Sequence, residues 1–240
     1  MARSAGVRGV TAADLEDLKR TAASRAADLV RSGSVVGLGT GTTAAHVVRR
    51  LGERLREGSL REVLGVPTSM ATARVARLSG VPLTTLEEHP SLDLTIDGAD
   101  EVDPALDLIK GRGGALLREK IVALASREVV IVVDHTKRVA RLGERAPVPV
   151  EVVRFGWAAA RAHLESLGAR VVLRMGPGSE PFVTEEGHYV LDGHFGPIAD
   201  PGRLAATIRS RVGVVEHGLF LALATTVLVA GPGGIQEMRR

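Results

Sequence analysis

Two segments of the sequence carry side chains suited to moving protons. In the first, Thr95–Asp103, the carboxylates Asp97 and Asp100 follow an apolar run and should emerge at the carboxyl end of a strand. Closely spaced carboxylates push their pKa values apart, which suits proton transfer. The cluster could instead be a magnesium site or a solvated turn. Metal binding is the weaker alternative, because the ammonium of Lys110 nearby would compete with a metal cation.

The second segment, Lys110–Lys120, is a glycine-rich loop that leads into a helix. Backbone N–H groups of such a loop could form an oxyanion hole. Three residues of the predicted helix form an apolar stripe: Leu117, Ile121 and Leu124. Glu119 is expected to point well away from this stripe. A lone glutamate in that position is usually solvated, but this one lies one turn after a loop that also carries Lys110.

A third segment, Val36–Thr43, is a Gly/Thr loop between a predicted strand and a predicted helix. Its glycines allow a ligand to approach the backbone, and the helix N-terminus offers free N–H groups to an anion. The loop is not a dinucleotide fingerprint, because Thr42 replaces the last glycine, and no Gly-Lys-Ser/Thr follows as in a P-loop. A phosphate cradle is favoured over a tight turn with a good N-cap.

Lysine is rare in this chain. Of 31 basic residues only four are lysine: Lys19, Lys110, Lys120 and Lys137. Lysine is a compact point charge on a flexible stem, which arginine cannot copy. Lys137 belongs to Asp134–Lys137, which directly follows a predicted strand. The lysines are therefore candidate functional residues, with chance survival in an arginine-rich chain as the alternative.

Composition excludes several classes of protein. With 240 residues, 45% of them hydrophobic and 25% charged, the chain is predicted to be globular. Aromatic residues make up 2%, and the net charge of +3 is dispersed, which disfavours nucleic-acid binding. The absence of cysteine excludes disulfides and thiolate zinc sites. We expect a cytoplasmic protein without a secretory signal or a membrane span.

Helical and strand patterns alternate over the first 133 residues, which predicts a mostly parallel α/β sheet with helices on both faces. The helical pattern covers residues 12–31, 44–57, 69–79 and 114–126, and the strand pattern covers 34–38, 61–66, 81–85, 92–97 and 128–133. Thr11 and Asp14 resemble a capping box at the start of the first helix, and Gly33 follows its end.

The pattern changes after Pro147. Six elements follow: strand 148–153, helix 157–167, strands 170–174 and 188–194, helix 201–211, and strand 212–220. This βαββαβ order is typical of a ferredoxin-like α+β unit. A last buried strand, 225–230, is expected to return to the first sheet. The predicted domains are therefore 1–147 with 221–240, and an inserted small domain, 148–220.

Taken together, these segments resemble the A type of ribose 5-phosphate isomerase over nearly the whole chain. The matching motifs are GLGTGTTAAH (37–46), VPTS (66–69), TIDGADEVD (95–103), KGRGGALLREK (110–120), DHTK (134–137), PVPVEV (147–152) and GVVEHGLF (213–220). The resemblance implies a Rossmann-like large domain with a ferredoxin-like small domain. It also implies no cofactor or metal, a phosphosugar substrate, a place in the non-oxidative pentose phosphate pathway, and a homodimer or dimer of dimers.

Carried over by position, the resemblance assigns the general base to Glu119. The other implied catalytic residues are Asp97, Asp100 and Lys110. The implied substrate-binding residues are Lys19, Thr40, Gly41, Thr42, Thr43, Asp97, Gly98, Ala99, Asp100, Lys110, Gly111, Arg112, Gly113 and Lys137. Two of these depart from the family pattern, because Arg112 stands where a glycine is usual and Thr42 where a serine is common.

The chemistry that follows is the interconversion of ribose 5-phosphate and ribulose 5-phosphate through an enediolate. Glu119 would move the carbon proton, and Asp97 would open the furanose ring and move hydroxyl protons. Asp100 and Lys110 would stabilise the enediolate. The alternatives are a sugar-phosphate sensor without turnover, and an isomerase-deaminase or acyl-CoA transferase on a similar fold.

Overall fold

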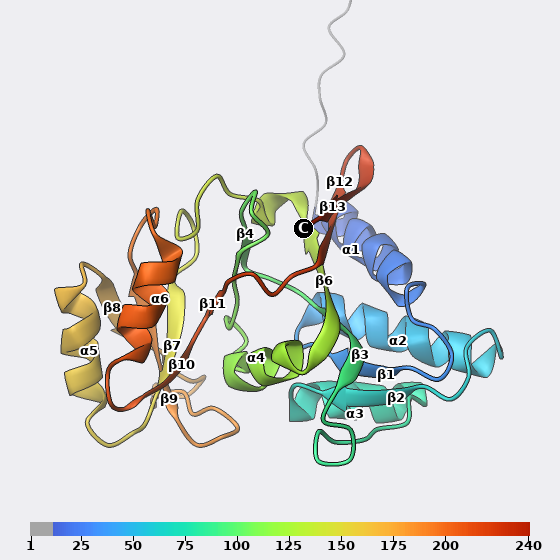
Figure 1. The fold of residues 1–240 in the computed structure, drawn as a ribbon, viewed down its shortest axis with the longest axis horizontal. Helices are drawn as coiled ribbons and strands as arrows, with labels where there is room; N and C mark the ends of the chain where they lie inside the picture. Colours follow the sequence, from blue (N-terminus) through green and yellow to red (C-terminus); the bar gives the residue numbers. More distant parts are fainter. Residues whose placement is uncertain (1–11) are drawn as a thin grey trace, which may run out of the picture.

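A computed structural model describes residues 12–240, and a six-stranded sheet forms its centre (Figure 1). The strands lie in the order β13-β12-β6-β3-β1-β2, and every neighbouring pair is parallel except β12 and β13. Their bounds are β1 Val35–Leu38, β2 Leu64–Pro67, β3 Leu92–Asp97, β6 Ser126–Asp134, β12 Thr226–Gly231 and β13 Gly234–Arg239. The predicted α/β fold with a mostly parallel sheet is confirmed.

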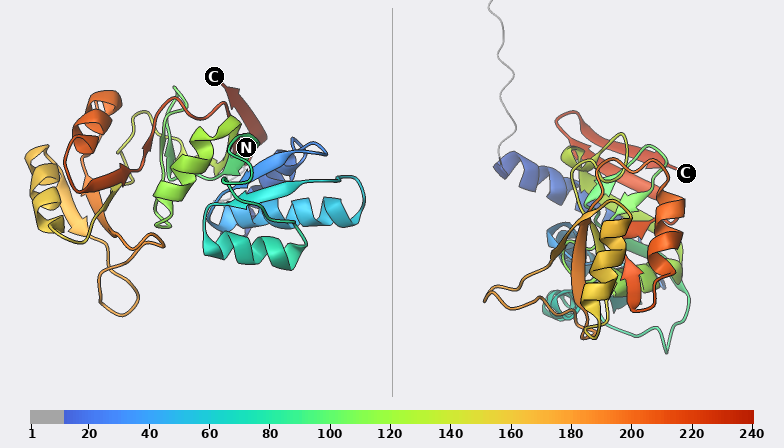
Figure 2. Two further views of the ribbon diagram at one scale, coloured as in Figure 1. Left: turned by 60° about the horizontal axis from the view of Figure 1, so that its bottom comes forward. Right: turned by 90° about the vertical axis from the view of Figure 1, so that its left-hand side faces the viewer.

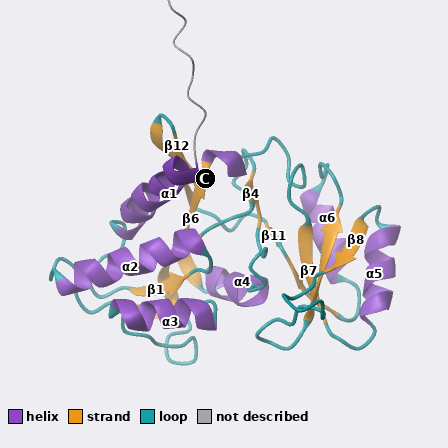
Figure 3. Cartoon of the chain, turned by 180° about the vertical axis from the view of Figure 1, so that it is seen from behind, coloured by secondary structure: helices purple, strands orange, loops and turns teal. Residues whose placement is uncertain are grey.

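Helices and a small sheet cover the two faces of the central sheet. One face carries α1 (Ala12–Ala27), α2 (Thr42–Arg56) and α3 (Met70–Ser79), as Figure 3 shows. The other face carries α4 (Leu116–Leu124) and a three-stranded sheet in the order β11-β5-β4. The bounds of these short strands are β4 Glu101–Val102, β5 Leu108–Ile109 and β11 Leu219–Phe220.

Alternating side chains of β6 explain why both faces are covered. Val130 and Val132 pack into the apolar cluster beneath α1 and α2, whereas Val129, Ile131 and Val133 pack into the cluster on the opposite side. Successive side chains of a strand point to opposite faces, so a strand buried on both faces is apolar throughout. A 3-10 helix, His135–Lys137, follows β6 directly.

A second, antiparallel sheet lies beside the first, with α4 between the two (Figures 1 and 2). Its elements are β7 Val148–Val152, α5 Trp157–Ser166, β8 Arg170–Leu173, β9 Tyr189–His194, α6 Pro201–Arg209 and β10 Val214–His217. Their sheet order, β10-β7-β9-β8, is that of the ferredoxin-like unit predicted from the sequence.

The predicted strand 212–220 is wrong in one respect, because the chain changes sheets at Gly218. β10 ends at His217 in the antiparallel sheet, and β11 begins at Leu219 beside β5. The Gly218 N–H donates to the carbonyl of Pro149 (2.7 Å), and the Gly218 carbonyl accepts from the Lys110 N–H (2.9 Å). A β-carbon at Gly218 would lie 2.2 Å from the Lys110 carbonyl oxygen, so only glycine allows this approach.

Other predicted elements also differ from the structure. The expected strand 81–85 is reduced to a bridge between Leu83 and Gly65, next to Pro82, which has no N–H to donate. The short strands β4 and β5 and the polar strand β13 have no counterpart in the prediction. The Thr11 cap lies outside the described residues. Within the described residues, no helix is long and apolar enough to cross a membrane.

Candidate active site

The candidate site forms where three neighbouring strands of the central sheet end. β1 leads into the Gly/Thr loop, β3 ends at Asp97, and β6 ends at Asp134 before the 3-10 helix that contains Lys137. These strands are adjacent and parallel, in the order β6-β3-β1, so their carboxyl ends meet at one edge. Ligands of open α/β sheets bind outside this edge.

A cavity of about 440 Å³ opens at this edge. It is lined by Lys19, Thr40, Gly41, Thr42, Thr43, Gly98, Ala99, Asp100, Lys110, Gly111, Arg112, Gly113, Glu119, Val132, Val133, Asp134 and Lys137. The sequence had singled out all but three of these as site residues. The three additions, Val132, Val133 and Asp134, are the end of β6. Of the predicted site residues, Asp97 alone does not line the cavity.

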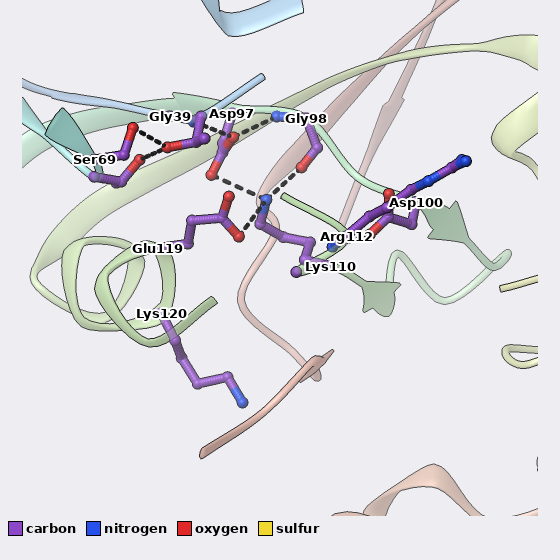
Figure 4. A network of polar contacts seen from close by, with 12 residues as sticks. Gly39, Ser69, Asp97, Gly98, Asp100, Lys110, Arg112, Glu119 and Lys120 are labelled. Atoms are coloured by element: carbon purple, nitrogen blue, oxygen red, sulfur yellow. Dashed lines mark hydrogen bonds and ion pairs between the residues drawn. The ribbon is translucent and has the colours of Figure 1, made fainter. Parts of the chain in front are cut away.

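Lys110 is the centre of a buried charged cluster (Figure 4). Its Nζ lies 3.0 Å from Asp97 Oδ2 and 3.3 Å from Glu119 Oε2, and it donates to the carbonyl of Gly98 at 2.6 Å. The three charged side chains are only 3–5% exposed. Burial of this kind requires charges to be paired, and here two carboxylates share one ammonium.

Burial and this excess of negative charge together set the protonation of the cluster. Burial raises the pKa of the Glu119 carboxyl to about 7, although the Lys110 ammonium opposes the change and the charge on Asp97 adds to it. Burial alone would lower the pKa of Lys110, but the carboxylates of Asp97 and Glu119 raise it, so this lysine stays charged. A carboxyl with a pKa near neutrality suits a general base.

Glu119 is buried, whereas the sequence pattern had placed it on the solvated side of its helix. The buried face of α4 consists of Leu116, Glu119, Lys120, Val122 and Ala123. The predicted stripe lies on the other side, with Ile121 46% and Leu124 65% exposed. Leu116, Val122 and Ala123 bury this face of the helix, and the two charged groups on it find buried partners. In the described part of the chain, the ion pair with Lys110 Nζ at 3.3 Å is the one polar contact of Glu119 Oε2, and no other group donates to this oxygen, so it can accept a proton.

The Gly/Thr loop presents the N-terminus of α2 to the cavity. Gly41 is the N-cap residue, with φ 114°, and it has no side chain to occupy the first N–H groups of the helix. Gly39 is required on the other side of the loop, because a β-carbon there would lie 2.1 Å from Asp97 Oδ1. Free N–H groups and the helix dipole together favour a bound anion.

Thr40 differs from Thr42 and Thr43 in what its hydroxyl contacts. Thr40 Oγ1 lies 2.7 Å from Thr68 Oγ1 and 2.9 Å from Ser69 Oγ, so it belongs to a hydroxyl network beneath the loop. The Thr40 N–H donates to Asp97 Oδ1 at 3.2 Å. The network residues Thr68 and Ser69 come from the VPTS motif, whose sequence indicated the family but not a role in the site.

Asp100 and the 111–113 loop both line the cavity and contact each other. The Arg112 N–H donates to Asp100 Oδ2 at 3.0 Å, which fixes the loop. The Arg112 side chain extends away from Lys110 and Glu119 (Figure 4). The bulk of arginine at this usual glycine position therefore does not fill the space beside the carboxylates. Among residues 12–240, no group of three or more His, Asp or Glu side chains could hold a metal ion.

The fold and the site together define an α/β protein with an added antiparallel sheet, whose cavity joins a buried cluster of carboxylates and lysine to a Gly/Thr loop at a helix N-terminus. The family model of ribose 5-phosphate isomerase A (phosphoriboisomerase A) matches residues 64–234. A ribose-5-phosphate isomerase A of Synechococcus sp. (strain JA-3-3Ab) is 54% identical and covers 95% of this chain and 99% of its own length. One from Roseiflexus castenholzii is 56% identical, with 92% and 94% covered.

Solved structures agree with the sequence relatives. A D-ribose-5-phosphate isomerase in complex with phospho-erythronic acid superposes with a TM-score of 0.92 at 36% identity, covering 94% of this chain and 99% of the other. Ribose 5-phosphate isomerase A of Methanocaldococcus jannaschii superposes with a TM-score of 0.89 at 40% identity and the same coverage. The chain belongs to the ribose 5-phosphate isomerase A family.

Proposed function

We propose that this chain is an aldose–ketose isomerase that interconverts D-ribose 5-phosphate and D-ribulose 5-phosphate. The observation that carries the proposal is the buried Glu119 carboxyl, whose pKa is about 7 and whose Oε2 lies 3.3 Å from Lys110 Nζ. It lines the same cavity as the Gly/Thr loop, which is suited to binding an anion. A base of this kind can both take and return a carbon proton at neutral pH. Family membership and a relative's complex with phospho-erythronic acid support the same substrate class.

Proton transfer between the two carbons would pass through an enediolate. Glu119 removes the proton from C2 of the open-chain aldose and delivers it to C1. Negative charge develops on the substrate oxygens, where the Lys110 ammonium stabilises it. The N–H groups of Gly111 and Gly113 are the further donors, because the N–H of Arg112 is taken by Asp100. Asp97 keeps Lys110 charged and in place.

Opening of the furanose ring and transfer of hydroxyl protons require a carboxyl that faces the substrate. Asp100 lines the cavity, whereas Asp97 is 3% exposed and lies beneath it. Asp97 also accepts hydrogen bonds from the N–H groups of Thr40 (3.2 Å) and Gly98 (2.7 Å). We therefore assign the ring-opening step to Asp100, in place of Asp97 as the sequence suggested.

The 5-phosphate would be held at the N-terminus of α2 by Thr42, Thr43 and the backbone of Gly41, whereas Thr40, whose N–H donates to Asp97, would shape the loop. Lys19 and Lys137 line the same cavity and supply positive charge. Binding energy from the phosphate, which does not react, positions C1 and C2 against Glu119.

The proposal includes the organisation of the protein. The predicted domains, a catalytic domain of 1–147 with 221–240 and a small domain of 148–220, are supported by the separate antiparallel sheet with its own helices, except that Leu219 and Phe220 pair with β5 and would belong to the catalytic domain. A homodimer or dimer of dimers is supported by exposed apolar side chains such as Met70 and Leu124, which light scattering can test. A cytoplasmic location is proposed from the metabolic substrate.

The direct test is to incubate the chain with ribose 5-phosphate in D₂O and to follow ribulose 5-phosphate by NMR. We expect conversion, with deuterium incorporated at the carbon that receives the proton. Saturable binding of ribose 5-phosphate without conversion would contradict the proposal and favour the sugar-phosphate sensor. A repeat in EDTA tests the expectation, drawn from the family resemblance, that turnover needs no metal.

A further inference from the structure

Lys120 follows the proposed base on α4, but its side chain turns away from the cavity (Figure 4). Its Nζ lies 2.8 Å from Glu216 Oε1, 2.6 Å from the His217 carbonyl oxygen and 3.3 Å from His217 Nδ1. The side chain is 9% exposed. All three ammonium hydrogens thus have partners in one short piece of chain at the end of β10.

The 216–220 segment holds Lys110 as well. The Gly218 carbonyl accepts from the Lys110 N–H at 2.9 Å, and Leu219 pairs with Ile109, the residue before Lys110. The ring of Phe220 lies 5.5 Å from Lys110 Nζ and 4.8 Å from Lys120 Nζ, within the range of a cation–π contact for both. One segment therefore contacts the backbone of Lys110 and the side chain that follows Glu119.

The attachment of Lys120 is rigid because its partners are themselves fixed. Glu216 Oε2 lies 2.9 Å from Arg209 Nη1, and Glu216 Oε1 also accepts the His217 N–H at 2.8 Å. Burial, together with the charge of Lys120, lowers the pKa of His217 to about 4. The imidazole is therefore neutral near pH 7, and its Nδ1 can accept from Lys120 and from the Leu219 N–H.

We propose that Lys120 is a positioning residue for proton transfer: it ties α4 to the 216–220 segment and so fixes the Glu119 carboxylate relative to Lys110. Lys120 does not touch the cavity and takes no part in the chemistry. The inference rests on the proposed function, since it assigns Glu119 as the base. Small displacements of reacting groups, on the order of 1 Å, can cost about 100-fold in rate.

The test compares Lys120→Met with the wild type, using ribose 5-phosphate. We expect kcat to fall about 10- to 100-fold. KM should change less than about threefold, because the phosphate contacts of Lys19, Lys137 and the Gly/Thr loop are untouched. The charged groups that face Glu119 are Lys110, Asp97 and Asp100. A looser contact with Lys110 should raise the pKa of Glu119, so the acid limb of kcat/KM should move to higher pH.

Arg118→Met is the matched control. Arg118 also tethers α4, but through ion pairs with Glu185 and Glu186 on the loop before β9, away from Lys110. The control should lose thermal stability without a change in kcat or in the pH profile. The proposal is overturned if folded Lys120→Met keeps kcat and the acid limb of the wild type, or if Arg118→Met changes both equally.

A second variant and a second measurement cover the remaining outcomes. If Lys120→Met does not fold, Glu216→Gln weakens the same attachment, and a smaller loss of kcat with the same direction of pH change is expected. If Glu216→Gln keeps the kcat and the pH profile of the wild type, the proposal is overturned. Should the wild type not convert ribose 5-phosphate, the proposed function fails by itself. The titration of Glu119, followed by carbon-13 NMR in the wild type and Lys120→Met, still tests the positioning.

Discussion

Two buried lysines next to the buried face of α4, Lys110 and Lys120, differ in how their charge is balanced. Lys110 contacts two carboxylates, Asp97 and Glu119, and lines an open cavity. Lys120 contacts one carboxylate, Glu216, and otherwise a carbonyl and a neutral imidazole. Both cations approach the same phenylalanine ring. The residue types are alike, yet only one cluster can exchange a proton with a ligand.

Burial and the number of carboxylates per ammonium together set this difference. Burial raises the pKa of Glu119 to about 7, and the charge of Asp97, which shares the Lys110 ammonium with Glu119, adds to the rise. In the Lys120 cluster, burial acts to raise the pKa of Glu216, but the hydrogen bond and the charge of Lys120 outweigh it and lower that pKa. The first cluster is poised for acid–base chemistry, and the second is a fixed attachment.

The largest expected effect is that of Glu119→Gln. The amide keeps the shape of the side chain but cannot accept a carbon proton, so kcat should fall by about 10²- to 10⁴-fold, the usual contribution of general base catalysis. Steady-state conversion of ribose 5-phosphate measures the loss. Activity within a few-fold of the wild type would remove Glu119 as the base.

Lys110→Met should have the next largest effect. Without the ammonium the developing enediolate loses its main electrostatic partner, and kcat should fall by about 10²- to 10³-fold. Because Lys110 opposes the rise in the pKa of Glu119, that pKa should rise further in the variant. Kinetics combined with NMR titration of Glu119 checks both effects, and an unchanged Glu119 titration would contradict the charge balance described above.

The pH dependence of the wild type follows from the same cluster. Glu119 must be ionised to act as the base, and its pKa is about 7. We expect kcat/KM to decline as the pH falls below about 7, tenfold per unit once Glu119 is mostly protonated. An acid limb near pH 4.5, the value for an ordinary glutamate, would show that Glu119 is not held as the structure indicates.

Thermal stability should reveal the cost of ionising Glu119. Its folded-state pKa is raised above the unfolded value, so the stability it contributes at low pH is lost as the pH rises through about 7. The Glu119→Gln variant has no carboxyl to ionise at this position, so its stability does not fall in this way as the pH rises. The melting temperature of the variant should therefore gain on the wild type by a few degrees between pH 5 and pH 8, measured by calorimetry at matched ionic strength.

The smallest effect on melting temperature is expected for His217→Gln, and its pH dependence runs in the opposite direction to that of Glu119→Gln. Its folded-state pKa is lowered to about 4, so its contribution is present above pH 6.5 and is lost as the pH falls towards 4. The His217→Gln variant has no imidazole to protonate, so it does not lose this stability as the pH falls. The gap in melting temperature between wild type and variant should narrow from pH 7 to pH 4. A gap that widens on acidification would mean that the imidazole is charged in the folded state.

Much of the site could be predicted from the sequence, because its loops follow apolar strands and carry glycines and charges in short motifs. The burial of Glu119 could not be predicted from the sequence. Amphipathic patterning counts a glutamate as outward-facing, and its actual partner, Lys110, is brought near by the β5 strand pairing. The position of Lys120 depends on Glu216 and His217, almost a hundred residues further along the chain.

The fold shows the same limit. The ferredoxin-like order was evident from alternating elements, because each element buries its own apolar pattern. The change of sheet at Gly218 was not evident from the sequence, since it depends on close contacts with Pro149 and Lys110. Two-residue strands such as β4 and β5 have too few residues to show a period. Strand β13 has a largely polar sequence, which concealed its pairing with β12.

Strand β13 also has a consequence for the behaviour of the protein in concentrated solution. Its neighbour β12 is almost wholly buried and apolar, with Val227, Leu228 and Val229 in sequence. Left unpaired, such a strand would offer a row of free N–H and C=O groups to other chains and would promote aggregation. β13 instead gives the sheet an edge that carries Gln236, Glu237 and Arg239. Shortening the chain at Pro232 should therefore make it prone to assemble edge to edge.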